Sequence, residues 1–259
     1  MARFVSSVGV RKANLPILQL WMLGLLAGAF IAFGAMLFTL VMTGNDLGFG
    51  LMRWIGGIAF SLGLVLVIVG GAELFTGNNL IVMAWAERKI TTRQLLRNWS
   101  VVYVANLVGA LASVMLVWYS GTLNMSAGAV SHTAAAIASA KIELGFLEAF
   151  VRGILCNTLV CLAVWLCFSA HDVSGKILSI IYPISAFVAL GFEHSIANMY
   201  LIPIGMLAGG GEIDVLKFSS SLFSVTLGNI VGGSVFVALV YWIVYLRGEG
   251  QAMRGPEDR

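Results

Sequence analysis

The stretches "GGAELFTGNNL", from Gly70 to Leu80, and "ALGFEHSIANM", from Ala189 to Met199, decide the fold. Each interrupts a long apolar segment with a Glu, a Thr or His, and Asn residues. Polar side chains and free backbone groups are costly in hydrocarbon unless they line a cavity or are buried in protein. Two similar interruptions in one chain therefore indicate a functional feature of the fold.

The composition indicates an integral membrane protein. The chain has 259 residues, is 59% hydrophobic and 10% charged, and has a mean hydropathy of +0.95, whereas soluble domains are about 25% charged. A helix needs about 20 apolar residues to cross the hydrocarbon core. Six such stretches predict six transmembrane helices, at 17–42, 52–87, 95–119, 146–169, 177–208 and 223–246. The second and fifth are too long for one crossing, so we expect both to be broken helices.

The distribution of positive charge predicts the orientation. With six crossings, the N-terminus, the second and fourth loops and the C-terminus share one side, and by the positive-inside rule this basic side is cytoplasmic. It carries 11 of the 15 Lys and Arg residues: Arg3, Arg11, Lys12, Arg88, Lys89, Arg93, Arg97, Lys176, Arg247, Arg254 and Arg259. This distribution needs no nucleic-acid partner. The first apolar stretch is too long for a signal-peptide core, so we expect no secretory signal.

The expected organisation is one membrane domain with two short flanking segments. A cytoplasmic segment covers 1–16, a transmembrane domain covers 17–246, and a cytoplasmic tail covers 247–259. The three cysteines all lie in the fourth apolar stretch, at spacings that suit neither metal binding nor a disulfide framework. We interpret them as packing residues and expect no metal and no cofactor.

The two interruptions belong to an internal repeat. The pattern Gly-x-Glu, with Asn five residues after the Glu, occurs at 71–78 and again at 191–198, an offset of 120. The segments that follow, "ANLVGALASVMLVWY" from Ala105 and "GNIVGGSVFVALVYW" from Gly228, align at an offset of 123. We infer a duplicated three-helix unit. Because three crossings is an odd number, the second copy is inverted, and matched broken helices in inverted halves indicate a transport site.

These motifs resemble those of a known family. "GGAELFTGNN", "NLVGAL", "ILCNTLVCLAVWL", "GFEHSIANMYLIP" and "GNIVGG" are similar to the formate/nitrite transporter family, and the resemblance runs from Val10 to Arg247. It implies an all-α, aquaporin-like protomer with six helices, formed by repeats at about 17–119 and 146–246. It also implies a homopentamer in which each protomer holds its own pore.

His194 is the leading candidate for a functional residue. Ionisable side chains at membrane depth usually serve a function, and histidine can change its charge near neutral pH. The resemblance implies that His194, in "EHSIAN", is the pore histidine. Thr76 lies at the matching break, where its hydroxyl would donate a hydrogen bond to an anion. A capping role at a short helix, 79–86, is compatible with that function.

The resemblance also supplies candidate pore residues. Taken alone, these would be ordinary packing residues. The resemblance implies apolar constrictions on either side of the histidine and a loop that gates the pore from the cytoplasmic side. The constrictions would be formed by Phe60, Leu64 and Phe187, and the gating loop by Leu74, Phe75 and Thr76.

Two carboxylates and two amides accompany the breaks. Glu73 and Glu193 would repel a permeating anion, so we place them behind the pore wall, accepting hydrogen bonds from free N–H groups of the broken helices. Asn157 and Asn198 would form hydrogen bonds around the histidine and the break, or join helices without contacting a substrate.

Lys141 and a neighbouring charged pair precede the break of the second half. The spacing of Lys141 to Asn157 matches the family, and the side chain would attract anions to a vestibule or extend to the membrane surface. Glu148 and Arg152 are four residues apart, so we expect an ion pair on one helix.

The predicted function is a channel or proton-linked transporter for small monovalent weak-acid anions. A bare anion would stall at an apolar constriction, and protonation removes that barrier. Formate is favoured by "ITTRQLLRNW", "FSLGLVLV" and "LIPIG". Gly77 and Asn78 stand where the formate branch has Ser and Thr, which leaves nitrite and hydrosulfide open. The expected partners are the anion, protons and the bilayer.

Two other classes of protein fit the sequence less well. An aquaporin-like architecture could conduct water or glycerol, but the Asn-Pro-Ala boxes of aquaporins are absent, with "IAN" and "GNN" at the breaks. An intramembrane enzyme would need a base and a nucleophile in suitable geometry. His194 and Ser195 are adjacent and have no third orienting group, so we expect no enzyme.

Overall fold

The computed structural model describes residues 1–44, 46–211 and 214–248, and all regular structure in these residues is helical. The end of the predicted cytoplasmic tail, with Arg254 and Arg259, lies outside the described residues.

The first half of the chain forms five helices and one short 3₁₀ segment. Two of the helices, α1 and α4, are too short to cross a membrane. In chain order the elements are α1 (Ala2–Ala13), α2 (Ile17–Val41), α3 (Phe49–Gly70), the 3₁₀ helix η1 (Gly77–Ile81), α4 (Val82–Ala86) and α5 (Thr92–Tyr119).

The second half repeats this order. Two 3₁₀ turns, η2 (Thr122–Asn124) and η3 (Ser126–Gly128), lead into it. The helices are α6 (Ala129–Ile142), α7 (Phe146–Ser169), α8 (Val173–Ala189), α9 (Ser195–Ala208), and one continuous helix made of α10 (Val215–Val231), the π-helical stretch η4 (Gly232–Leu239) and α11 (Val240–Tyr245).

Five helices of the described residues are long and apolar enough to cross a membrane: α2, α3, α5, α7 and the continuous helix from α10 to α11. The apolar helices α8 and α9 are shorter. The predicted segments 52–87 and 177–208 are each divided into separate helical pieces. The protein is an all-helical, multi-pass membrane protein.

Two helices were not predicted. The segment 1–16 is mostly the helix α1, and α6 occupies a region where no helix was expected. Both were missed because neither reaches the length of a membrane crossing. Alanine provides the helix propensity of α6, whose sequence is "AVSHTAAAIASAKI".

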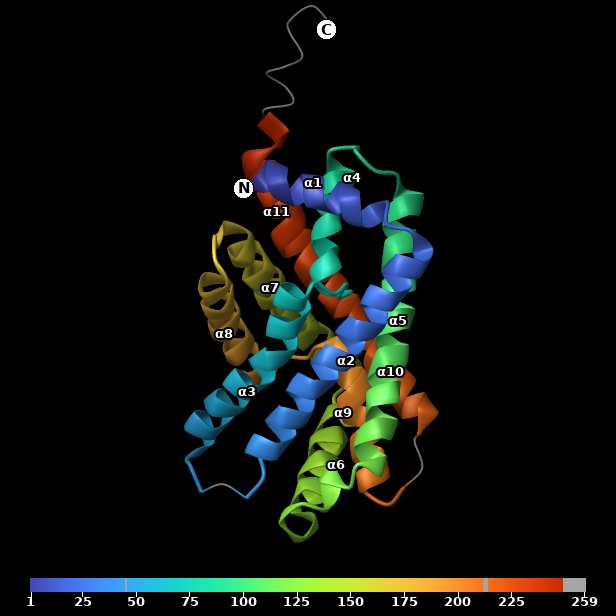
Figure 1. Ribbon diagram of the computed structural model, residues 1–259, viewed down its shortest axis with the longest axis vertical. Coiled ribbons are helices and arrows are strands. Elements are labelled where there is room, and N and C mark those ends of the chain that lie inside the picture. The colour runs from blue at the N-terminus through green and yellow to red at the C-terminus, as the bar shows by residue number, and fades with distance from the viewer. Residues whose placement is uncertain (45, 212–213, 249–259) are drawn as a thin grey trace, which may run out of the picture.

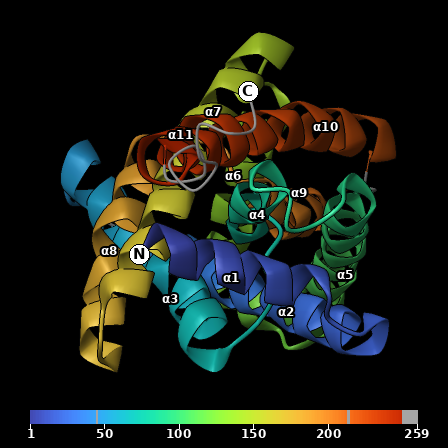
Figure 2. The ribbon, with the colours of Figure 1, turned by 90° about the horizontal axis from the view of Figure 1, so that it is seen from above.

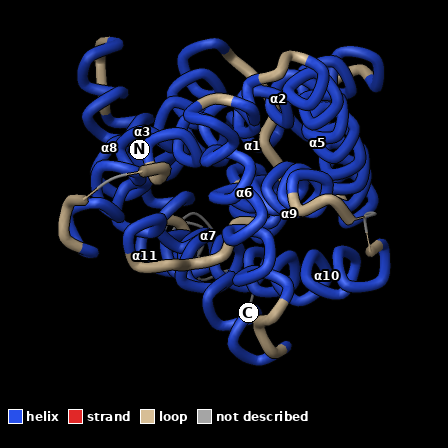
Figure 3. The backbone as a smooth tube through the Cα atoms, turned by 90° about the horizontal axis from the view of Figure 1, so that it is seen from below, coloured by secondary structure: helices blue, strands red, loops and turns tan. Residues whose placement is uncertain are grey.

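The other helices surround helix α9. Figure 1 places α1, α4 and α11 at one end of the molecule, which we call the α1 face, and α6 at the opposite end, the α6 face. Helix α2 packs on α3 and α5, α7 packs correspondingly on α8 and α10, and α3 and α8 join the halves. Helix α9 lies inside, against α5 and α6, as the views from the two faces show (Figures 2 and 3).

Glycines bring the backbones of the paired helices into contact. A Cβ atom on Gly28 would lie 2.1 Å from the carbonyl oxygen of Asn106, across the α2–α5 crossing. A Cβ atom on Gly228 would lie 2.1 Å from the carbonyl oxygen of Phe150, across the α7–α10 crossing. Any side chain at either position would push the helices apart.

We therefore expect Gly228→Ala to lower the free energy of unfolding by about 1–3 kcal/mol, the usual cost of overpacking. The matched control is Gly50→Ala in α3, where an added Cβ meets nothing within 4 Å. Because alanine favours helix over glycine, this control should be neutral or stabilising by at most about 1 kcal/mol. Thermal unfolding in one detergent compares them. Equal melting temperatures would contradict the close crossing.

Candidate functional site

The two interruptions seen in the sequence, at 70–80 and 189–199, begin with the same turn. Gly71 and Gly191 follow α3 and α8 with φ values of +80° and +73°, a left-handed conformation that favours glycine. The next N–H in each case donates to a carbonyl five residues earlier, from Ala72 to Val67 at 2.8 Å and from Phe192 to Phe187 at 3.0 Å. These are the terminating bonds of a Schellman motif, repeated at the offset of 120 seen in the sequence.

Asn106 of α5 satisfies the backbone of the first break. Its Nδ2 donates to the carbonyl oxygens of Gly24 at 2.8 Å and Glu73 at 3.0 Å, and its Oδ1 accepts from the N–H of Phe75 at 3.0 Å. Each of these backbone groups would cost about 1–3 kcal/mol if buried without a partner. One amide side chain therefore holds the break to both α2 and α5.

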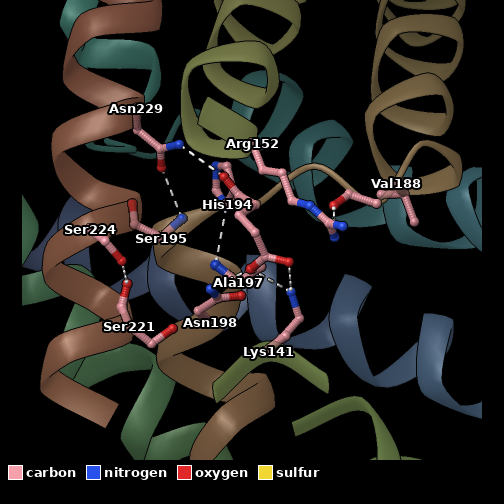
Figure 4. A network of polar contacts seen from close by, with 12 residues as sticks. Lys141, Arg152, Val188, His194, Ser195, Ala197, Asn198, Ser221, Ser224 and Asn229 are labelled. Atoms are coloured by element: carbon pink, nitrogen blue, oxygen red, sulfur yellow. Dashed lines mark hydrogen bonds and ion pairs between the residues drawn. The ribbon is translucent and has the colours of Figure 1, made fainter. Parts of the chain in front are cut away.

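Asn229 of α10 does the same for the second break. Its Nδ2 donates to the carbonyl oxygens of Gly153 at 2.8 Å and Glu193 at 2.9 Å, and its Oδ1 accepts from the N–H of Ser195 at 2.9 Å (Figure 4). The sequence paired Asn106 with Asn229 but did not indicate this role.

Each break also carries an ion pair. Lys12 of α1 donates to Glu73 Oε1 at 2.8 Å, and Asn78 Nδ2 donates to Glu73 Oε2 at 2.8 Å. In the second half, Lys141 of α6 lies 2.9 Å from both oxygens of Glu193, and Asn198 Nδ2 donates to Glu193 Oε2 at 2.7 Å. The lysines are 129 residues apart, the same offset as Gly24 and Gly153, so the repeat includes α1 and α6.

The structure corrects the expected surroundings of the two glutamates. Their carboxylates accept hydrogen bonds from lysine and asparagine side chains, not from N–H groups of the broken helices, because Asn106 and Asn229 already serve the breaks. Glu193 also lines a cavity instead of lying behind its wall. Lys141 neutralises that charge.

His194 joins the two halves of the protein. Its Nε2 lies 2.9 Å from Thr76 Oγ1, and its Nδ1 accepts from the N–H of Ala197 at 3.1 Å, which caps α9. Because Nδ1 accepts, the proton of the neutral ring is on Nε2, and Nε2 donates to Thr76. The side chain of Thr76 makes no helix-capping hydrogen bond, so the expected capping role is wrong.

His194 and the aromatic residues beside it close a large cavity. On the α6 face a cavity of about 410 Å³ is lined by His194, Phe60 and Phe187, among others. The Phe60 and Phe187 rings meet edge to face at 5.7 Å, and the Phe187 ring lies 5.9 Å from the His194 ring. Leu64 and Leu74 line a much smaller cavity, of about 30 Å³, on the α1 face.

The structure places two other predicted site residues away from these cavities. Phe75 packs against Trp99 and Tyr103 of α5, with ring centroids 6.0 and 4.9 Å away, and lines neither cavity. Asn157 Nδ2 donates to Asn79 Oδ1 at 2.9 Å and to the carbonyl oxygen of Asn229 at 2.7 Å. Asn157 therefore ties the first break to the second half.

Other charged residues complete the cavity on the α6 face. Arg152 and Glu148 form the predicted pair, at 2.5 Å. Arg152 also lines the cavity, together with Arg53, which reasoning from the sequence missed because the carbonyls it binds lie 135 and 136 residues away. Lys12 was counted only as a charge of the N-terminal segment, although its spacing before Gly24 matches that of Lys141 before Gly153. No group of three potential metal ligands occurs among the described residues.

These features define a class of protein: an all-helical, multi-pass membrane protein with a cavity on each of two faces, an arrangement found in channels and transporters. Residues 1–243 match the model of the formate/nitrite transporter family. The chain belongs to this family.

Individual relatives are consistent with membership of this family. The formate channel FocA of Escherichia coli K12 is 41% identical over 266 residues, covering 95% of this chain and 93% of the relative. A probable formate transporter of Methanothermobacter thermautotrophicus is 40% identical over 263 residues, covering 95% and 96%. An uncharacterized Bacillus subtilis transporter, YrhG, is 41% identical over 249 residues, covering 95% and 92%.

Solved structures share the fold. A pentameric formate channel with formate bound matches with a TM-score of 0.82 and 39% identity, covering 89% of this chain and 98% of that one. An ion channel of the same family has a TM-score of 0.85 and 30% identity, covering 94% and 98%. The aquaglyceroporin of Plasmodium falciparum, with a TM-score of 0.53 and 16% identity over 87% and 99%, shares the architecture alone.

The Lys141–Glu193 pair provides a test of how the second break is held. The side chains of Lys141 and Glu193 are 15% and 5% exposed, so we expect Glu193→Gln to cost about 3 kcal/mol of unfolding free energy by leaving the lysine charge unpaired. Adding Lys141→Gln should recover part of this loss. Glu148→Gln, in an exposed pair, should cost less than about 1 kcal/mol. Additive losses in chemical or thermal unfolding would show that the two groups are not coupled.

Proposed function

We propose that this protein is a channel or proton-linked transporter for small monovalent weak-acid anions, formate first among them, in a bacterial cytoplasmic membrane. The observation that carries the proposal is His194, bound to Thr76 of the other half where Phe60 and Phe187 close the larger cavity. The names of its relatives support formate as the substrate.

We infer six crossings from the arrangement of the helices. Helix α3 with η1 and α4 would form one broken crossing, and α8 with α9 the other, in addition to α2, α5, α7 and the continuous helix from α10 to α11. The α1 face, which holds α1 and α11, would be cytoplasmic by the positive-inside rule. The cavity on the α6 face is then a periplasmic vestibule. The segments 1–16, 17–246 and 247–259 keep their proposed assignments.

The proposed transport step uses a proton. An anion in the vestibule accepts a proton from a hydronium ion of the vestibule solution in the region of His194. The O–H bond of the neutral acid forms, or the second S–H bond for hydrosulfide, and the hydronium ion is left as water. The neutral acid passes the apolar constriction and releases the proton on the other side, so one proton accompanies each anion. Protonation removes the cost of desolvating a charge at Phe60 and Phe187.

His194 is placed to assist in this step through Thr76. In the observed arrangement Nε2 donates to Thr76 Oγ1, which leaves the threonine hydroxyl hydrogen free to donate to a passing oxyanion. His194 could take a second proton only at Nδ1, which would have to release the N–H of Ala197. Charging the ring therefore requires a local change at the start of α9.

The substrate assignment has alternatives within the same fold. Gly77 lines the small cavity, and Asn78 takes part in the Lys12–Glu73 cluster, so both departures from the formate branch lie at the cytoplasmic side of the break. Nitrite and hydrosulfide remain alternatives.

We also propose a homopentamer, by analogy with the pentameric formate channel. We propose no enzymatic activity and no cofactor.

Anion uptake by proteoliposomes tests the function. We expect the wild-type protein to take up formate faster at pH 5 than at pH 8 when the inward-directed anion gradient is held constant, because protonation accompanies transport. His194→Ala should lower uptake roughly a hundredfold, the lower end of what a positioned acid–base group contributes, or abolish its pH dependence. Formate, nitrite and hydrosulfide are compared in parallel.

The experiment has two controls, the size of the oligomer in detergent and the water flux of the vesicles. The variant should remain an oligomer of wild-type size in detergent. Osmotic swelling of the same vesicles without any anion separates an anion transporter from a water or glycerol channel. Equal uptake by wild type and His194→Ala at both pH values would make the histidine structural and overturn the proton-linked mechanism.

A further inference from the structure

Two arginine side chains converge on the second break. Arg53 of α3 donates from Nη2 to the carbonyl oxygen of Val188 at 2.7 Å and from Nε to that of Ala189 at 3.2 Å. Arg152 of α7 donates from Nη1 to the carbonyl oxygen of Gly191 at 3.2 Å (Figure 4). A Cβ atom on Gly191 would lie 3.3 Å from Nη2 of Arg53 and 3.6 Å from Nη1 of Arg152. The two guanidinium groups therefore flank one glycine.

The fold does not require arginine at position 152. The N–H of Glu193 donates to the carbonyl oxygen of Arg152 at 3.3 Å, and in the first half the N–H of Glu73 donates to that of Leu23 at 3.2 Å. Arg152 and Leu23 are thus equivalent positions of the repeat. The first half builds the same break with a leucine.

The carbonyl groups at the two breaks also differ in their partners. In the first half the groups equivalent to Val188, Ala189 and Gly191 belong to residues 68, 69 and 71, by the offset of 120. Within the described part of the chain, none of these three carbonyls accepts a hydrogen bond from a side chain. A break of this shape forms without guanidinium groups, so the arginines serve something besides the turn.

The charges in the vestibule are not balanced. Arg53, Lys141 and Arg152 line it together with one carboxylate, Glu193, which Lys141 already pairs. Glu148 pairs with Arg152 but is 52% exposed and does not line the cavity, and such an exposed pair is weak. Two half-buried guanidinium groups of like charge are therefore held side by side without a buried counter-ion among the cavity-lining residues.

We propose that Arg53 and Arg152 form, across Gly191, a binding site for a small planar oxyanion in the vestibule. The inference rests on the proposed function and extends it to a substrate class. A guanidinium group presents donors in a rigid plane that matches a carboxylate, and a glycine leaves the space between the two planes open. Formate and nitrite each offer two oxygens to this pair. Hydrosulfide has a single sulfur atom as its acceptor and cannot present two coplanar oxygens to a guanidinium group.

Concentration dependence of transport tests the site. We would measure KM and Vmax for formate, nitrite and hydrosulfide in proteoliposomes of known orientation, with the anion supplied from either face. Arg53→Gln and Arg152→Gln should each raise KM for formate and nitrite roughly tenfold from the α6 face, as expected for loss of one charge-assisted hydrogen bond. Vmax from the α6 face should stay near wild type, and Vmax/KM should fall by the same factor from the two faces, because a substitution cannot change the equilibrium of passive transport. Arg152→Lys keeps the charge and should raise KM for the two oxyanions but not for hydrosulfide.

Lys217→Gln is the matched control, since it removes a positive charge on the same face outside this cavity and should leave every KM unchanged. A fall in Vmax from both faces with unaltered KM would show that the arginines only hold the break, and would overturn the site. Equal effects on hydrosulfide and formate would overturn the planar selectivity. If the wild-type protein moves none of the three anions, the proposed function fails first. Transport of formate with unchanged KM in the variants rejects the arginine site alone.

Discussion

The structure depends on hydrogen bonds to the backbone N–H and carbonyl groups that become free where two helices end inside an apolar protein. A helix that ends at Gly71 or Gly191 leaves carbonyl and N–H groups that hydrocarbon cannot solvate. Asn106 and Asn229 supply both a donor and an acceptor at these points. Since each amide reaches three backbone groups, one residue per half fixes the break against two helices, and the side chains that follow are held in place.

The duplication explains why so much of the polar interior occurs in pairs. The pairs Asn106 and Asn229, Glu73 and Glu193, and Lys12 and Lys141 have equivalent partners in the two halves. Where equivalents differ, the difference follows from the side chain. Asn98 accepts a hydrogen bond from Asn78, whereas its counterpart Ser221 is shorter, and the Oγ of Ser221 and the Oδ1 of Asn198 have no partner among the described residues.

Much of this could be predicted from the sequence, because it is encoded locally. Apolar length located the long helices, and the Gly-x-Glu pattern located both breaks and the repeat. Helices α1 and α6 were not predicted because they are too short to cross a membrane. Arg53 was not predicted because the carbonyl groups to which it donates lie far from it in the sequence. Phe75 does not line a cavity, as predicted for it, because it packs against aromatic rings of α5. Contacts between segments distant in sequence decide these cases.

The residue that breaks the symmetry of the halves is the one on which the proposed mechanism depends. By the offset of 120, His194 is the counterpart of Leu74, and each lines the cavity on its own face. Two inverted copies with identical side chains would present the same chemistry to both sides. Here one side presents an imidazole joined to Thr76 and the other presents leucine. On the proposed function, an anion meets a group that can exchange protons from one direction and an apolar closure from the other, so the duplicated frame carries an unequal pair of gates.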